Sequence, residues 1–181
     1  MRLPLHAALL RGINVGGKNR LPMKDLAAMF DAAGCGSVST YIQSGNVLFE
    51  ASPALARRIP ALVGKAISDR FGYRVPVVLR SAVELRRIAR GNPFLKAGAD
   101  LDELHVVFLS DSPSAAMGRA LDPDRSPPDE FALRGREIYL RCPNGYGRSK
   151  LTNAYFDSKL STTSTVRNWR TVVKLLELSR G

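Results

Sequence analysis

The sequence predicts an α+β protein of two ferredoxin-like halves, packed as one compact unit with C-terminal helices. Two observations indicate this fold. Over residues 1–80, apolar strand-like runs and helical patterns alternate in the order β-α-β-β-α-β, which is the split βαβ arrangement. Over residues 81–181 a second, less regular α/β half follows, with two helices at its end and no disordered linker before it.

The first half opens with a buried strand over residues 6–10 and a glycine-rich loop. Residues 23–30 place their apolar side chains on one helical face, and Gly34 suits the end of that helix. The elements expected next are a hairpin or a single bulged strand over 38–49, a helix over 53–71, and a strand over 74–79 in which Pro76 favours a sheet edge or a bulge.

The second half is predicted from weaker patterns. Its expected elements are a helix over 81–90, a strand over 104–109, a short helix over 113–121, a proline-rich loop over 122–130, a hairpin over 131–141, and helices over about 148–160 and 165–179.

The charge balance points to an anionic partner. The chain of 181 residues has 27 Lys and Arg against 16 Asp and Glu, which gives a net charge of +11. The excess is largest over residues 131–181, which contain ten basic and three acidic side chains. Such a balance favours attraction to nucleic acid, phosphorylated ligands or acidic partners, and a basic solvated surface is the alternative interpretation.

The remaining composition limits the class of protein. Cys35 and Cys142 match no metal-ligand spacing, so we expect no metal site. Two thiols, with no signal peptide evident, indicate a reducing cytoplasm. No apolar run approaches the roughly 18 residues that a membrane span needs, so we expect no membrane association.

The glycine loop GINVGGKN, residues 12–19, matches the phosphate-binding pattern G-x-x-x-x-G-K-S/T at every position except the last. Asn19 stands where the magnesium-binding hydroxyl belongs, and Pro22 delays the helix start, so the sequence argues against a nucleoside triphosphatase. Two interpretations remain. Either the loop is an anion nest beside Arg11 and Lys18, or its glycines only permit positive φ in a tight connection.

Four segments carry a family resemblance. They are ALLRGINVGGKNRLPM (8–23), TYIQSGNVLFE (40–50), NPF (92–94) and TVRNWRTVVKL (165–175). Together they resemble domain of unknown function family 1697, a group of uncharacterised bacterial proteins. The resemblance implies an α+β fold with ferredoxin-like halves and no assigned activity.

Three further segments offer groups for a ligand. The polar turn at residues 43–46 suits base or sugar recognition, or it satisfies its own backbone. The basic turn at 144–150 precedes a predicted helix and suits an anion, or Ser149 only caps that helix. In the last predicted helix, an apolar stripe lies beside a basic stripe of Arg167, Arg170 and Lys174.

The best interpretation of these features is a protein that binds a polyanion, nucleic acid or RNA, through a basic surface. The alternative is an enzyme or effector-binding protein for a small phosphorylated or nucleotide-like ligand, and a protein-binding role without a small ligand is a third option. No residue stands out as a general base, so the sequence specifies neither catalysis nor a cofactor. The candidate anion-binding residues are Arg11, Asn14, Lys18, Asn19, Asn46, Arg148, Ser149, Lys150, Arg167 and Arg170.

Overall fold

The computed structural model describes residues 3–180 of the chain. They form two compact units. The first consists of the chain up to Arg86 together with the segment from Leu175 onward, and the second is Arg87–Lys174.

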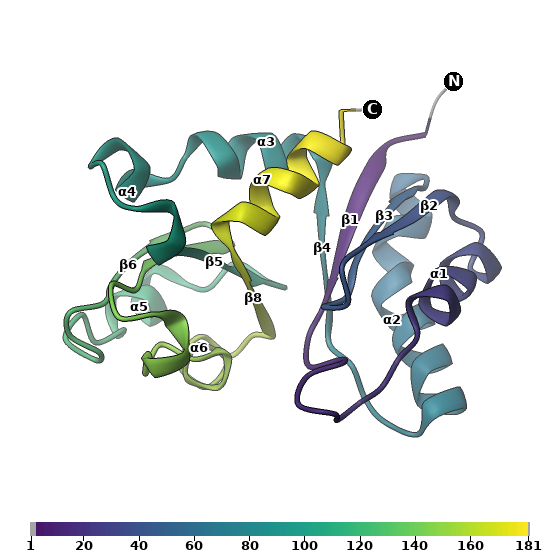
Figure 1. The fold of residues 1–181 in the computed structure, drawn as a ribbon, viewed down its shortest axis with the longest axis horizontal. Coiled ribbons are helices and arrows are strands. Elements are labelled where there is room, and N and C mark those ends of the chain that lie inside the picture. Colours follow the sequence, from purple (N-terminus) through teal and green to yellow (C-terminus); the bar gives the residue numbers. More distant parts are fainter. Residues whose placement is uncertain (1–2, 181) are drawn as a thin grey trace. The chain divides into compact units, whose positions relative to one another are not determined.

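The first unit is a split βαβ fold, as predicted. Its antiparallel sheet has the order β2-β3-β1-β4 and comprises β1 (Leu5–Leu10), β2 (Gly36–Tyr41), β3 (Asn46–Glu50) and β4 (Val77–Ser81). Helices α1 (Met23–Ala32) and α2 (Pro53–Phe71) cover one face of this sheet (Figure 1). Phe30 and Ile59 of these helices are fully buried against Leu10 and Phe49 of the strands, which makes this layer the core of the unit.

The second unit has the same topology. Its sheet has the order β6-β7-β5-β8, with β5 (Leu104–Leu109), β6 (Glu130–Arg134), β7 (Glu137–Arg141) and β8 (Ser164–Asn168). Its two βα crossovers contain α5 (Ala115–Arg119) and α6 (Asn153–Leu160), while α3 (Ala82–Arg90) and α4 (Pro93–Lys96) precede β5. The predicted fold of two similar α+β halves is therefore confirmed, and the second half is more regular than its sequence suggested.

The strand registers of the two units correspond residue by residue. His6 lies opposite Phe49 on one side and Ser81 on the other, and His105 has the same place between Leu140 and Asn168. The hydrogen bond from the Leu10 N–H to the Gly45 oxygen (2.8 Å) recurs as the bond from Leu109 to Arg136 (2.9 Å). The two units therefore have the same strand register and the same hydrogen bond at the end of the first strand.

The predicted helix over 165–179 is wrong in its first part. Residues Ser164–Asn168 form β8, and only Trp169–Leu178 form the helix α7. Val166 pairs with Val107 across the sheet, so a non-local ladder overrides the helical spacing of this segment. The predicted basic stripe therefore does not exist, because Arg167 lies in a strand and Arg170 in a helix.

Two other boundaries differ from the prediction. Helix α6 begins at Asn153 with Thr152 as its N-cap, whose hydroxyl accepts from the Tyr155 N–H (3.2 Å), and not near Ser149. Strand β4 begins at Val77, so Pro76 precedes the ladder and removes no donor from it. Residues 38–49 form a hairpin and not one bulged strand.

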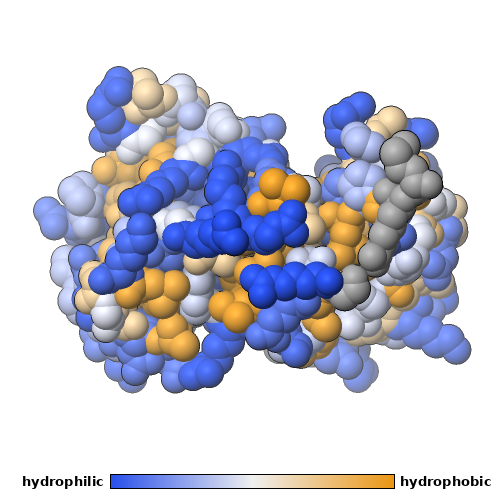
Figure 2. Space-filling view, turned by 90° about the horizontal axis from the view of Figure 1, so that it is seen from above, coloured by the Kyte–Doolittle hydropathy of each residue, from blue (hydrophilic) through white to orange (hydrophobic). Residues whose placement is uncertain are grey.

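One face of the molecule is mainly hydrophilic (Figure 2). On the face seen in Figure 2, hydrophilic side chains cover most of the area and hydrophobic ones form small separate patches. Among the residues that the structure describes, no helix combines the length and the apolar character needed to cross a membrane.

Candidate anion-binding site

Three connections meet at one end of the first unit's sheet, and we call them the loop end: residues 11–22, 42–45 and 72–76. The Arg11 N–H donates to the Pro76 oxygen (3.0 Å), and the Tyr73 hydroxyl donates to the Arg20 oxygen (2.8 Å). In Figure 1 the β1–α1 loop and the α2–β4 connection lie at the same end of the unit. Segments far apart in the sequence therefore form one surface.

Asn14 fixes the long loop from inside. Its backbone is left-handed (φ 54°), and its side-chain nitrogen donates to the backbone oxygens of Leu21 (2.9 Å) and Gln43 (2.9 Å). Its side-chain oxygen accepts from the Leu21 N–H at 2.8 Å. All three bonds join backbone groups, so Asn14 positions the loop and does not aim its amide nitrogen outward.

The tip of the loop is a tight turn. The Lys18 N–H donates to the Val15 oxygen (3.0 Å), and Gly16 and Gly17 have φ values of 56° and 74°. Two successive positive φ values require a primed turn, for which Gly-Gly is favoured. Asn19, also left-handed, closes the loop by donating its side-chain amide to the Gly12 oxygen (2.9 Å). The glycines are therefore needed for the turn itself.

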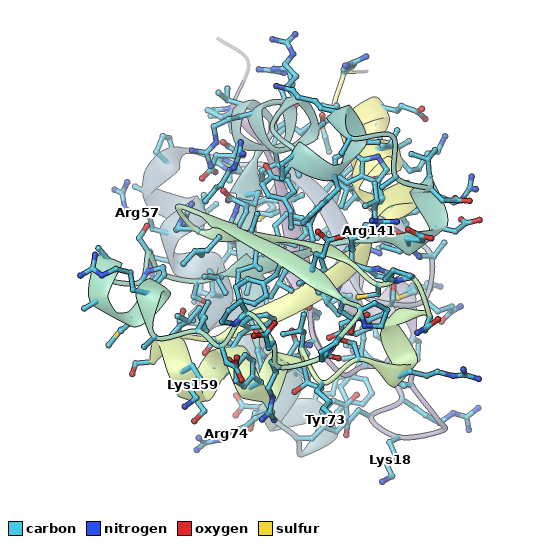
Figure 3. The ribbon with its side chains drawn as sticks, turned by 90° about the vertical axis from the view of Figure 1, so that its left-hand side faces the viewer. Lys18, Arg57, Tyr73, Arg74, Arg141 and Lys159 are labelled. Atoms are coloured by element: carbon cyan, nitrogen blue, oxygen red, sulfur yellow. The ribbon has the colours of Figure 1, made fainter. Side chains whose placement is uncertain are left out.

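Cationic side chains surround this turn. Lys18, Arg20 and Arg74 are exposed, and among the described residues no carboxylate lies within ion-pair distance of them. Lys18 projects from the tip of its loop, and Tyr73 and Arg74 lie toward the same lower side of the view in Figure 3. Arg70 differs, because it pairs with Asp25 at 3.0 Å. The loop end thus has unneutralised positive charge.

A hollow opens beside the loop. It has a volume of about 680 Å³, and its lining residues are Asn14, Gly17, Arg20, Leu21, Pro22, Gln43 and Phe71. This volume lies within the roughly 300–1,000 Å³ of small-molecule sites, which are also lined by apolar side chains with a few polar groups.

Asn46 supports the neighbouring turn and is fully buried. Its side-chain nitrogen donates to the Tyr41 oxygen (3.1 Å) and to the Ser44 hydroxyl (3.0 Å). The next residue back, Gly45, has φ 83°, and a Cβ on it would lie 2.8 Å from the Leu10 Cβ. The amide of Asn46 therefore serves the packing of the turn.

The second unit contains the other predicted residues. The Ser149 hydroxyl accepts from the Leu151 N–H (3.0 Å), while Arg148 and Lys150 are exposed. Arg170 forms an exposed ion pair with Asp102 at 2.7 Å. These residues belong to a different unit from the loop end.

Arg167 is not a surface cation. Only 7% of it is exposed, and it donates to the Thr165 hydroxyl (2.8 Å) and the Val166 oxygen (2.8 Å). Burial lowers the pKa of its guanidinium to about 10. The prediction that Arg167 faces an anion from a basic helical stripe is wrong, because that prediction placed it on a helix.

Of the predicted residues, the structure thus brings together Arg11, Asn14, Lys18, Asn19 and Asn46. Sequence reasoning missed Arg20, Phe71, Tyr73 and Arg74. The missed signal was topological: β1 and β4 are antiparallel neighbours in a split βαβ sheet, so the loop after β1 must meet the connection before β4. Within the described part of the chain, no three His, Cys, Asp or Glu side chains are arranged to hold a metal.

Comparisons with known proteins place this architecture in a family. The structure is similar to that of conserved bacterial protein SP0830 from Streptococcus pneumoniae, with a TM-score of 0.75, 20% sequence identity, and coverage of 98% of this chain and 99% of that chain. A likeness at this identity shows the fold alone. No curated protein matches the chain. The family model described as "Protein of unknown function (DUF1697)" matches residues 4–139, well over half of the chain, and the protein therefore belongs to this family, as the four sequence segments indicated.

Proposed function

We propose that the loop end of the first unit binds a small phosphorylated ligand. The phosphate lies at the tip of the glycine loop, where Lys18 and Arg20 supply positive charge. The remainder of the ligand occupies the hollow beside Gln43 and Phe71.

The observation that supports this proposal best is a difference between the two units. In the first unit residues 11–22 connect β1 to α1, whereas in the second residues 110–114 connect β5 to α5. Both connections begin with the same backbone bonds, since Arg11 donates to Pro76 and Ser110 donates to Thr163 (2.8 Å). The second unit shows that this fold needs only a short connection here. The long loop therefore requires another explanation, and ligand binding supplies one.

The chemistry of the tip suits an anion. Within residues 3–180, the backbone N–H groups of Gly16 and Gly17 have no acceptor. Successive N–H groups in left-handed backbone form a concave, partly positive surface, and a nearby Lys or Arg adds charge-assisted hydrogen bonds. The bonds made by Asn14 hold this surface in place before a ligand arrives, which lowers the entropy cost of binding.

Binding is favoured over catalysis. The histidines of the chain, His6 and His105, lie in strands and stack on Phe49 and Tyr146 at 5.5 and 5.1 Å between ring centroids. Burial lowers the pKa of both imidazoles. His6 is the second residue of β1, and the glycine loop follows the other end of that strand. Within the first unit, His6 is therefore not at the loop end to act as a base.

Binding of a polyanion such as RNA is the second candidate, and the net charge of +11 favours it. Ferredoxin-like RNA-binding domains stack bases on exposed aromatic side chains of the sheet. In this protein Phe49, Phe108 and Tyr139 are buried and Tyr41 is half-buried, so the strands offer little aromatic surface for that mode of binding. A polyanion would bind mainly through exposed cations such as Lys18, Arg148 and Lys150.

Isothermal titration calorimetry tests the proposal with ribose 5-phosphate, nucleoside monophosphates and inorganic phosphate. We expect Lys18→Ala to weaken binding by roughly tenfold or more, because a charge-assisted hydrogen bond contributes about 1.5–3 kcal/mol. Arg57→Ala is the matched control, since it removes an exposed cation from α2.

Equal losses in both variants, or no binding of any phosphate ester, would contradict the proposal. A labelled single-stranded RNA examines the second candidate. Binding of that RNA with a steep salt dependence, and no binding of the small esters, would favour the polyanion instead.

A further inference from the structure

Ile42 has an unusual backbone for its type. It has φ 50° in the turn between β2 and β3, and 51% of it is exposed. The left-handed region is costly for a β-branched side chain, and exposing an apolar side chain contributes nothing to stability. Both features of Ile42 oppose folding, so they call for a reason outside the fold.

The second unit has a shorter turn at the same place in its sheet, residues 135–136 against 42–45. Tyr41 pairs with Asn46 and Arg134 pairs with Glu137, so the residues after them, Ile42 and Gly135, begin the corresponding turns. Gly135 also has a positive φ, 63°, which glycine adopts without strain. The first unit has isoleucine where the second has the unstrained residue.

A second exposed apolar side chain lies in the adjoining loop. Val15 is 64% exposed, and it follows Asn14, whose amide is bonded to Gln43 beside Ile42. That single hydrogen bond therefore holds together the two loop positions that carry Val15 and Ile42. Val15 and Ile42 do not line the hollow themselves, but their chain neighbours Asn14 and Gln43 do, so both residues lie next to it.

We infer that Val15 and Ile42 are the apolar contacts for the base of a nucleotide whose phosphate is held by the glycine loop. This inference rests on the proposed function and names the class of ligand. Aliphatic side chains pack well on the flat face of a base, and burying them recovers the apolar area that the free protein exposes. The Gln43 side-chain amide, which is exposed and has no hydrogen-bond partner among the described residues, supplies a donor and an acceptor for the base edge.

The surroundings favour a base over an alkyl chain. The hollow combines the apolar residues Leu21, Pro22 and Phe71 with the polar residues Asn14, Arg20 and Gln43, whereas an alkyl chain needs a continuous apolar channel. A sugar phosphate has no apolar face to contact Val15 and Ile42. A base linked to a phosphate presents both kinds of surface.

The test compares AMP, GMP, CMP and UMP with ribose 5-phosphate and hexyl phosphate by calorimetry, on wild type and on Ile42→Asn. Asparagine tolerates left-handed backbone, so this variant should unfold at the same or a higher denaturant concentration than wild type. We expect it to bind the best nucleotide at least about tenfold more weakly, and to bind ribose 5-phosphate unchanged. Val83→Ala is the control, because Val83 is 66% exposed in α3 and its truncation should leave affinity unchanged.

The outcomes separate the two proposals. If ribose 5-phosphate binds wild type as tightly as every nucleotide, or hexyl phosphate binds more tightly, the base contact is overturned and the phosphate site stands. If no phosphate ester binds, the proposed function itself fails. If Ile42→Asn unfolds at a lower denaturant concentration, the side chain serves the fold, and the inference is also overturned.

Discussion

The side-chain amide of Asn14 donates a hydrogen bond to the backbone oxygen of Gln43 at 2.9 Å, and so joins two loops that lie 29 residues apart in the sequence. The same nitrogen donates to Leu21, whose N–H is bonded to the Asn14 oxygen. One side chain therefore fixes both the shape of the glycine loop and its distance from the β2–β3 turn.

Asn14→Asp tests this arrangement with almost no change in volume. The carboxylate keeps the bond from the Leu21 N–H, but it loses both donated bonds and places negative charge against two carbonyl oxygens. We expect a loss of roughly 2–4 kcal/mol in the free energy of unfolding, measured by urea titration. Asn144→Asp, in an exposed turn, is the control. An Asn14→Asp variant as stable as this control would show that the bonds do not hold the loop.

The same variant should also bind phosphate esters more weakly. The new negative charge lies in the loop that we propose to hold an anion, and like charges repel more strongly where water is partly excluded. Calorimetry with ribose 5-phosphate measures this effect. Unchanged affinity in a folded Asn14→Asp protein would place the anion elsewhere.

Gly45 lies in the same turn as Gln43, and we predict that Gly45→Ala lowers the free energy of unfolding more than an ordinary glycine substitution. A Cβ there would lie 2.8 Å from the Leu10 Cβ and 2.9 Å from the Ile13 Cδ1, at a φ of 83°. Gly72 has a similar φ, 77°, with no atom within 4 Å of the added carbon. Gly72→Ala therefore measures the backbone cost alone, roughly 1 kcal/mol. Gly45→Ala adds a steric cost of roughly 1–3 kcal/mol. Chemical denaturation compares the two, and equal losses would show that the turn relaxes freely.

The elements that sequence predicted well have local causes. Helix α2 occupies Pro53–Phe71, as expected, because Ser52 caps it through the Leu55 N–H (3.2 Å) and Gly72 ends it in left-handed backbone. The first strand of each unit is a short, almost wholly apolar run. These signals lie within a few residues of the element that they define.

Strand β8 has no such signal. It consists of Ser164–Asn168, includes a buried arginine, and continues into α7 without a turn residue between them. Its strand state depends on pairing with β5, which lies more than fifty residues away in the sequence. A non-local ladder cannot be read from a five-residue segment. Because the segment was predicted to be helical, Arg167 was predicted to be a surface cation.

Sequence predicted the location of the candidate site but not the roles of its asparagines, because those roles depend on non-local contacts. Glycines and charges identified the loop at 11–19, and Lys18 is exposed as its position suggested. What sequence cannot distinguish is an asparagine that faces a ligand from one that satisfies backbone groups. Asn14, Asn19 and Asn46 all donate to backbone oxygens, and that role depends on loops that only the folded chain brings together.

Arg167 and Arg170 should behave oppositely when truncated, although both lie on the same predicted stripe. Arg167→Ala removes a buried side chain and its bonds to the Thr165 hydroxyl and the Val166 oxygen, so we expect a loss of roughly 2–4 kcal/mol in unfolding free energy. Arg170→Ala breaks only an exposed pair with Asp102, and its unfolding midpoint should stay close to that of wild type. Urea titrations decide the matter. An Arg167→Ala protein as stable as Arg170→Ala would argue against the buried role.

The two thiols predict how stability changes at alkaline pH. Burial raises the pKa of Cys35 and of Cys142 to about 11 in the folded protein, with nearby Asp31 and Asp129 adding to the shift. In the unfolded chain both thiols ionise near their ordinary pKa of roughly 8.5. Between these values the folded state retains protons that the unfolded state has lost, so the free energy of unfolding falls as pH rises from about 9 to about 11.

The measurement is a set of urea titrations at pH 8, 9, 10 and 11 on wild type and on the double variant Cys35→Ala, Cys142→Ala. Other groups, including Tyr73 and Tyr139, whose pKa values burial also raises, contribute equally to both proteins and cancel in the difference. We expect the wild type to lose more stability than the double variant across this range, and its thiols to react slowly with a disulfide reagent at pH 8. Parallel pH profiles would mean that the folded thiols ionise as readily as those of the unfolded chain, which the burial of Cys142 at 1% exposure argues against.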